Sequence, residues 1–152
     1  RRSAMPRSKA PPLAPALPDD IEQQFYEALQ NCDIEALMAV WADDDDIFCV
    51  HPGGPRVVGP AAIRAAFEGI FNNGPVDARP DKVRRVNGPA CAVHSVLEQV
   101  RMMTDEGMQS AWVIATNVYM QTARGWRLVA HHASPGSLQE MQELIEAGST
   151  IH

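Results

Sequence analysis

The sequence predicts an α+β fold in a single domain, with helices first and antiparallel strands after them. The chain of 152 residues is long enough for one hydrophobic core and too short for two ordinary ones. Apolar residues recur at helical spacing in 19–41 and 60–71, whereas 82–134 contains apolar runs bounded by turn residues. No run approaches the roughly 20 apolar residues of a membrane span, so we expect no membrane helix.

The first 18 residues differ from the rest in composition. They contain five prolines and no acid, and their apolar residues follow no period. We therefore predict that 1–18 is a disordered or partner-draped arm, and that its short, proline-broken apolar stretch is not a secretory signal. The folded domain then spans 19–135. Residues 136–152 are predicted to form a C-terminal helix and tail, with a capping box of Ser137 and Glu140.

Three helices are expected before the long strands. Asp19 or Asp20 is placed to cap the first, and Asp33 the short second one, with Trp41 on its inner side. Pro60 begins the third, which the glycine of the Asn-Asn-Gly sequence at 72–74 closes. The strands are expected at 47–51, 57–59, 82–86, 91–103, 110–122 and 126–134.

The segment 110–122 is apolar on both of its faces. Trp112 and Ile114 alternate with Val113 and Ala115, so neither face has the polar pattern of a surface exposed to water. Helices can cover one face, and a second copy of the chain can cover the other. We therefore expect a homodimer that packs sheet to sheet.

Charge and cysteine content limit the classes of partner. The formal net charge is −6, and because the first 18 residues carry four basic side chains, the remainder is more acidic still. Such a domain repels a phosphate backbone, so we expect no nucleic-acid partner, and no membrane partner either. The three cysteines show neither a metal-binding nor a disulfide pattern, which favours free thiols and a cytoplasmic protein.

Six segments together resemble a known family. They open with Phe-Tyr-Glu-Ala-Leu, continue through His-Pro-Gly-Gly and end in Gly-Trp-Arg-Leu-Val-Ala-His-His-Ala-Ser, and lie at 25–29, 33–37, 41–44, 51–54, 59–63 and 125–134. Over residues 19–135 the chain resembles the SnoaL-like branch of the NTF2-like superfamily, which includes ketosteroid isomerase and scytalone dehydratase. The resemblance implies an NTF2-like (cystatin-like) cone of N-terminal helices packed on a strongly curved antiparallel β-sheet, commonly dimeric, with a pocket at its open end.

The resemblance also implies positions for catalytic groups. His51 stands where the isomerase-like members have an aspartate base before a proline, and a neutral imidazole removes protons at physiological pH. The alternative is that His51 fixes the Pro-Gly-Gly turn. Asn117 falls near their oxyanion donor, although an amide between strands also satisfies backbone groups. Phe25 takes the place of their helix tyrosine, with Tyr26 next to it.

The last strand carries two adjacent histidines, which must face opposite sides. His132 lines the pocket if strict alternation continues from Trp126 and Leu128; the opposite assignment, with His131 inside, remains open. Glu98 is a reserve acid–base group, with a salt bridge to Arg101 or Arg127 as the alternative. The predicted catalytic set is therefore His51, Asn117 and His132, and the predicted ligand-lining set is Trp41, Phe25, Tyr26, Phe67, Trp112 and Glu98.

No metal or cofactor is expected, because the histidines and acids lack metal-ligand spacing, and Cys49, on the face of His51, is interpreted as a buried free thiol. Two functional hypotheses follow. The first is a ketosteroid-isomerase-like isomerase or lyase (a dehydratase) acting on a small, largely apolar carbonyl or hydroxyl compound. The second is a non-catalytic module that binds a small ligand or forms a dimeric protein-interaction surface. A cone filled by aromatic side chains favours the second.

Overall fold

The computed structural model describes residues 16–137, which form an α+β fold with most of the helices before the long strands. The elements are α1 (Pro18–Asn31), α2 (Ile34–Ala39), β1 (Phe48–Val50), β2 (Arg56–Val58), α3 (Pro60–Phe71), β3 (Asp77–Asn87), β4 (Cys91–Thr104), β5 (Gly107–Thr122) and β6 (Gly125–Pro135). The arm before residue 16 and the helix expected after Ser137 lie outside the described residues.

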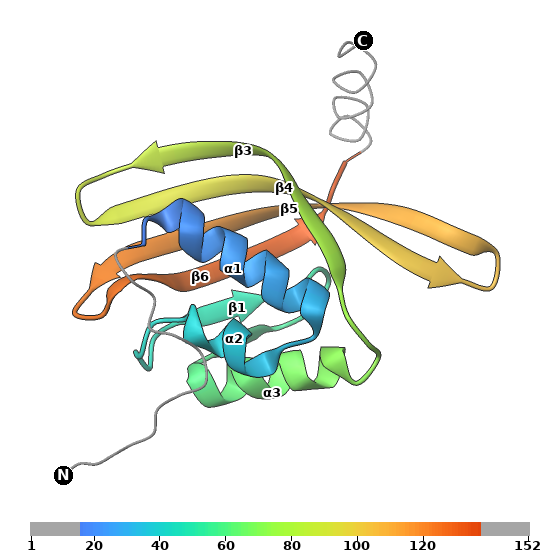
Figure 1. Ribbon diagram of the computed structural model, residues 1–152, viewed down its shortest axis with the longest axis horizontal. Coiled ribbons are helices and arrows are strands. Elements are labelled where there is room, and N and C mark those ends of the chain that lie inside the picture. Colours follow the sequence, from blue (N-terminus) through green and yellow to red (C-terminus); the bar gives the residue numbers. More distant parts are fainter. Residues whose placement is uncertain (1–15, 138–152) are drawn as a thin grey trace.

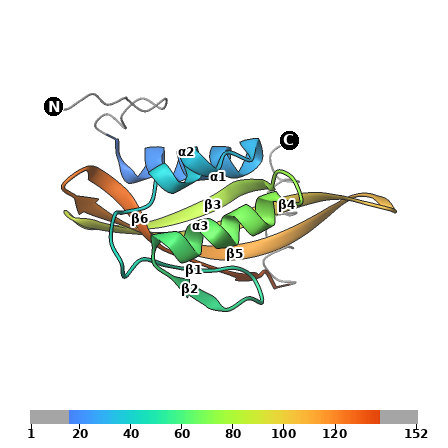
Figure 2. The same cartoon turned by 90° about the horizontal axis from the view of Figure 1, so that it is seen from below.

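The strands described form one curved sheet of six, in the order β2-β1-β6-β5-β4-β3. Every pair is antiparallel except β1 with β6. Figure 1 shows α1 in front of the long strands and α2 and α3 below them near β1, and Figure 2 shows α1 and α2 together on one side of the sheet. The predicted α+β, cystatin-like cone is confirmed. No described helix is long and apolar enough to cross a membrane.

Helix α1 begins two to three residues earlier than predicted. Leu17 is the N-cap residue, and the carboxylate of Asp20 accepts a hydrogen bond from the Leu17 N–H at 2.8 Å. The predicted cap at Asp19 or Asp20 is therefore wrong: the prolyl ring of Pro18 fits the first helical position, where no N–H is needed. The inner face of α1 is also wider than the apolar stripe, because Glu22 and Tyr26 are buried beside it.

The two sides of the sheet carry different side chains. On β5, Val113 and Ala115 face the helices and are buried, so Trp112 and Ile114 lie on the opposite face. We call that opposite face of β3–β6 the outer face. The prediction that Trp112 lines the cone is thus wrong, since alternation from the buried residues turns its side chain outward.

A β-bulge interrupts the pairing of β5 with β6. Asn117 pairs with His131, yet Tyr119 pairs with Leu128, so Val129 is an extra residue in β6. Leu128 and His131 therefore face the same side and are both buried, whereas His132 is exposed. The placement of His132 in the cone is wrong because strict alternation fails at the bulge.

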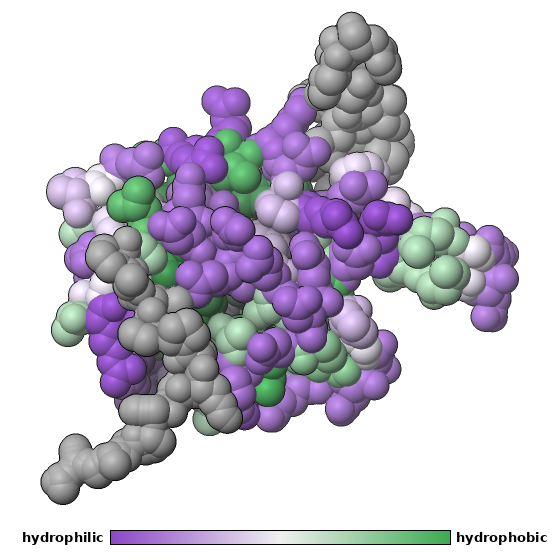
Figure 3. Space-filling model, viewed as in Figure 1, coloured by the Kyte–Doolittle hydropathy of each residue, from purple (hydrophilic) through white to green (hydrophobic). Residues whose placement is uncertain are grey.

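The hairpin between β4 and β5 extends past the helices on one side of the molecule (Figure 1). Its turn is Asp105–Glu106, and three methionines near the turn are exposed: Met102 by 47%, Met103 by 74% and Met108 by 53%. The space-filling view in Figure 3 shows hydrophobic surface on this hairpin, while the face over α1 and α2 is mostly hydrophilic.

Candidate functional site

Four chemically active side chains form one row across the concave face of the sheet. The strand register places Cys49 beside His131, His131 beside Asn117, and Asn117 beside His94. All four are buried. Because each comes from a different strand, this row exists only when β1, β6, β5 and β4 are paired as the structure shows.

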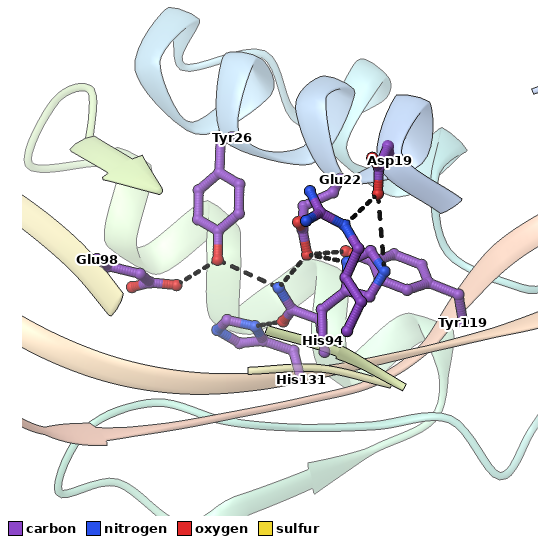
Figure 4. A network of polar contacts seen from close by, with 9 residues as sticks. Asp19, Glu22, Tyr26, His94, Glu98, Tyr119 and His131 are labelled. Carbon is purple, nitrogen blue, oxygen red and sulfur yellow. Dashed lines mark hydrogen bonds and ion pairs between the residues drawn. The ribbon is translucent and has the colours of Figure 1, made fainter. Parts of the chain in front are cut away.

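Helix α1 supplies the second half of the site. Glu22 and Tyr26 lie four residues apart on the helix and point together toward the row of side chains (Figure 4). The Oε2 atom of Glu22 accepts hydrogen bonds from the Tyr119 hydroxyl at 2.7 Å and from Asn117 Nδ2 at 3.1 Å. It also lies 3.0 Å from His94 Nδ1, which we assign as the donor because the carboxylate oxygen accepts.

Both polar atoms of the Asn117 amide are hydrogen-bonded inside the protein. Its amide nitrogen also reaches the hydroxyl of Tyr26 at 3.2 Å, and its carbonyl oxygen is paired with Nδ1 of His131. Tyr26 in turn donates its proton to Glu98 Oε2 at 2.6 Å. A substrate oxyanion would have to displace one of these partners before the amide could donate to it.

Burial is the main influence on the acids and bases of this network. It raises the pKa of Glu98 to about 7, although the hydrogen bond from Tyr26 acts in the opposite direction. Burial also raises the pKa of Tyr26 and of Tyr119. Burial also lowers the pKa of His131 to about 3, with the nearby His51 as the second cause. At neutral pH His131 is therefore uncharged, and Glu98 is close to the midpoint of its titration.

His51 lies at the end of β1, half-buried, with its ring edge-on to Phe67 at 4.8 Å between centroids. Burial lowers its pKa, so the imidazole is neutral at physiological pH. The sulfur of Cys49 is 3.8 Å from Nε2 of His51, but burial raises the pKa of this thiol to about 12. Cys49 is thus a protonated thiol and not an activated nucleophile.

Comparison with known proteins gives the family. Residues 19–137 match the model of the SnoaL-like domain. The chain belongs to the SnoaL-like family. Members of this family are small-ligand-binding proteins or isomerases and dehydratases. A search of curated proteins found no match.

Solved structures show the same fold. One, from Thiobacillus denitrificans and assigned as a calcium/calmodulin-dependent protein kinase type II association domain, is 34% identical over 79% of this chain and 95% of that one, with a TM-score of 0.71. Another, from Streptomyces avermitilis and assigned as a dehydratase of the NTF2-like family, is 27% identical over 78% and 93%, with a TM-score of 0.69. An NTF2-like protein from Pseudomonas putida, 18% identical over 80% and 87% with a TM-score of 0.68, shows the fold alone.

The structure joins some of the predicted site residues of this SnoaL-like domain and separates others. Asn117, Tyr26 and Glu98 share one hydrogen-bonded network, and the alternative salt bridge from Glu98 to Arg101 or Arg127 is not formed. Phe25 packs beside this network, against the ring of His131, and next to Phe67. His51 has no hydrogen bond to Asn117 within residues 16–137. Trp41 is buried, and it also lines a separate groove beyond the sheet edge.

Sequence reasoning missed Glu22, the central acceptor of the network. Its carboxylate stands next to Ile21 on the apolar stripe and one helical turn before Tyr26. The sequence signal that would have identified Glu22 is an acid four residues before a tyrosine, at the edge of an apolar helical stripe. Among the described residues, no three histidines, cysteines or acids are grouped so that they could hold a metal ion.

Proposed function

We propose that this SnoaL-like domain is an association module that joins a second copy of itself through the outer face of its sheet. The observation that carries the proposal is the apolar pairing across that face. Leu97 pairs with Ile114, and Val93 pairs with Val118, in the central strands β4 and β5. A sheet face that meets water is normally polar at alternate positions, so this face favours a protein partner.

The interior of the cone supports the same proposal. Its acids, amide and hydroxyls satisfy one another: Glu22 and Glu98 accept internal hydrogen bonds, and both polar atoms of the Asn117 amide are hydrogen-bonded. A binding site for a substrate presents polar groups that are free to meet it. A relative 34% identical to this chain is assigned as an association domain, which is consistent with assembly as the main role.

Sedimentation velocity on the full chain tests this proposal. We expect a dimer or larger assembly at about 50 µM, and a monomer for Ile114→Lys, because lysine places an unpaired charge in the centre of the outer face. Ala65→Lys, on an exposed position of α3, is the matched control and should assemble as the wild type does. A monomeric wild type, or an Ile114→Lys variant that assembles fully, would overturn the proposal.

A second candidate function is cofactor-independent proton transfer by His51, as in an isomerase or dehydratase. The observation favouring it is a neutral, half-exposed imidazole beside an interior whose Glu98 has its pKa raised to about 7. A small apolar carbonyl compound would give its α-proton to Nε2 or Nδ1 of His51. A neutral imidazole can accept the proton in this step.

Deuterium exchange at the α-position of a cyclic ketone, followed by NMR, tests the second candidate. His51→Ala is expected to slow the exchange at least ~10²-fold, while His132→Ala, a histidine exposed on the outer face, leaves it unchanged. Equal rates for the wild type and His51→Ala would exclude His51 as the base. Circular dichroism spectra should be the same for the wild type and both variants.

A further inference from the structure

A groove separate from the polar interior lies where α2, the start of α3 and the β5–β6 turn meet. Figure 1 shows these three parts on the same side of the molecule. The groove encloses about 950 Å³, enough for a small organic molecule. Its apolar surface comes from Met38, Trp41, Ala42, Ala61, Met120 and Val129.

Trp41 lines this groove and carries an unsatisfied hydrogen-bond donor that is buried beneath the groove surface. The side chain is only 5% exposed, and its indole Nε1–H has no acceptor among the described residues. A buried donor without a partner is unfavourable, and such groups are rare in folded proteins. Because Trp41 lines the groove, a molecule that fills the groove alters the surroundings of this indole.

Two arginines of the same groove lack an acidic partner. Arg124 and Arg127 make no ion pair within residues 16–137, although Arg127 donates to the carbonyl oxygen of Trp126 at 2.8 Å. Partial burial and the charge of Arg124 lower the pKa of Arg127, so the two cations are held together at an electrostatic cost. An anion between them would relieve that repulsion. The third arginine of the lining, Arg64, is already paired with Glu35 and Glu68.

The acids of the groove limit the charge that it accepts. Asp43 and Asp44 also line it, and Asp44 receives the backbone N–H of Asp46 at 2.7 Å. With two carboxylates beside two guanidinium groups, the groove favours a ligand with one negative charge. Further negative charges on the ligand would be repelled by the two aspartates. The apolar walls add a requirement for a hydrophobic body.

We propose that this groove binds organic monocarboxylates with an apolar body. The carboxylate lies against the guanidinium groups of Arg124 and Arg127, while the body packs on Met38, Met120 and Val129. Arginine suits this role because its planar group donates two parallel hydrogen bonds to a carboxylate. The site is separate from the polar interior, and its residues Met120 and Arg127 belong to the outer face near the ends of β5 and β6.

The indole N–H signals of the full chain provide a direct measurement. The protein has three tryptophans, so a ¹H–¹⁵N spectrum contains three such cross-peaks. Trp112→Phe and Trp126→Phe assign the Trp41 signal by elimination without altering the buried indole of Trp41. The probes are sodium octanoate and sodium 3-phenylpropionate, with octanamide as the uncharged analogue.

Both acids are expected to shift the Trp41 signal in a saturable manner, because Trp41 lines the groove that they fill. In the double variant Arg124→Gln/Arg127→Gln the dissociation constant should increase at least about tenfold. Arg56→Gln, at an exposed arginine of β2, is the matched control and should bind as the wild type does. Octanamide should leave the signal in place.

Three results would overturn the proposal. The first is no saturable shift with either acid. The second is an equal dissociation constant in the wild type and in the double variant. The third is a shift with octanamide as large as that with octanoate, which would show that the groove selects for the apolar body alone.

Discussion

A single carboxylate oxygen organises the interior of this domain. Oε2 of Glu22 accepts hydrogen bonds from Tyr119, Asn117 and His94, which come from two different strands. A buried acceptor shared by three donors is difficult to replace, because each donor loses its partner at once.

Glu22→Gln is expected to destabilise the protein by about 2–4 kcal/mol, since the amide brings a donor toward three donors. Urea denaturation followed by tryptophan fluorescence measures the change. Glu27→Gln, on the exposed side of the same helix, serves as the control and should change stability by less than about 0.5 kcal/mol. Equal midpoints for the wild type and Glu22→Gln would show that the network does not stabilise the fold.

Glu98 makes the stability depend on pH. Its pKa is about 7 in the folded protein and near its ordinary value of 4.5 in the unfolded chain, so the folded state binds the proton more tightly. The stabilisation is complete below the unfolded pKa and is lost as pH rises through about 7. From pH 5 to 8, the wild type should therefore lose roughly 2 kcal/mol relative to Glu98→Gln.

Glutamine keeps a carbonyl acceptor for the Tyr26 hydroxyl, so Glu98→Gln isolates the titration from the hydrogen bond. Parallel urea melts at several pH values give the two curves. Glu106→Gln in the exposed hairpin turn should follow the wild type. If Glu98→Gln does so as well, the carboxyl of Glu98 does not change its protonation in this range.

Two glycines test the backbone of one element, helix α3. Gly59 precedes the helix with φ of 93°, a conformation that an L side chain rarely adopts, whereas Gly69 is exposed in the helix with open space around it. Gly59→Ala should cost about 1–2 kcal/mol, and Gly69→Ala should add about 0.5–1 kcal/mol of stability. Thermal melts of both variants measure this difference in sign. Destabilisation by Gly69→Ala would contradict the helix assignment.

The regular elements were largely predictable, and the site was only partly so. The helices followed from apolar residues at a spacing of 3.6, and the strand order along the chain followed from turn residues. The bulge was not visible, because Leu128, Val129 and Ala130 are all apolar and fit either alternation. Glu22 was missed because a carboxylate beside an apolar stripe resembles a solvent-facing residue until its partners, 72 to 97 positions away, are known.

At the scale of the whole molecule, self-association should couple to stability. If two copies bury their outer faces, each folded chain is stabilised by its partner, so the melting temperature rises with protein concentration. A hundredfold dilution is expected to lower the melting temperature of the wild type and to leave that of Ile114→Lys unchanged. Calorimetry at two concentrations checks this. A melting temperature independent of concentration in the wild type would argue against a shared core between copies.

The extra residue at Val129 has a consequence for how such chains diverge. On the turn side of that position the inward residues of β6 fall on even numbers, and beyond it they fall on odd numbers. The loss of that one codon would remove the bulge and restore strict alternation, with Leu128 and His131 still facing the interior and His132 the surface. In this strand a bulge absorbs a change of length by one residue, so that insertion or deletion there leaves the chemistry of the interior unchanged.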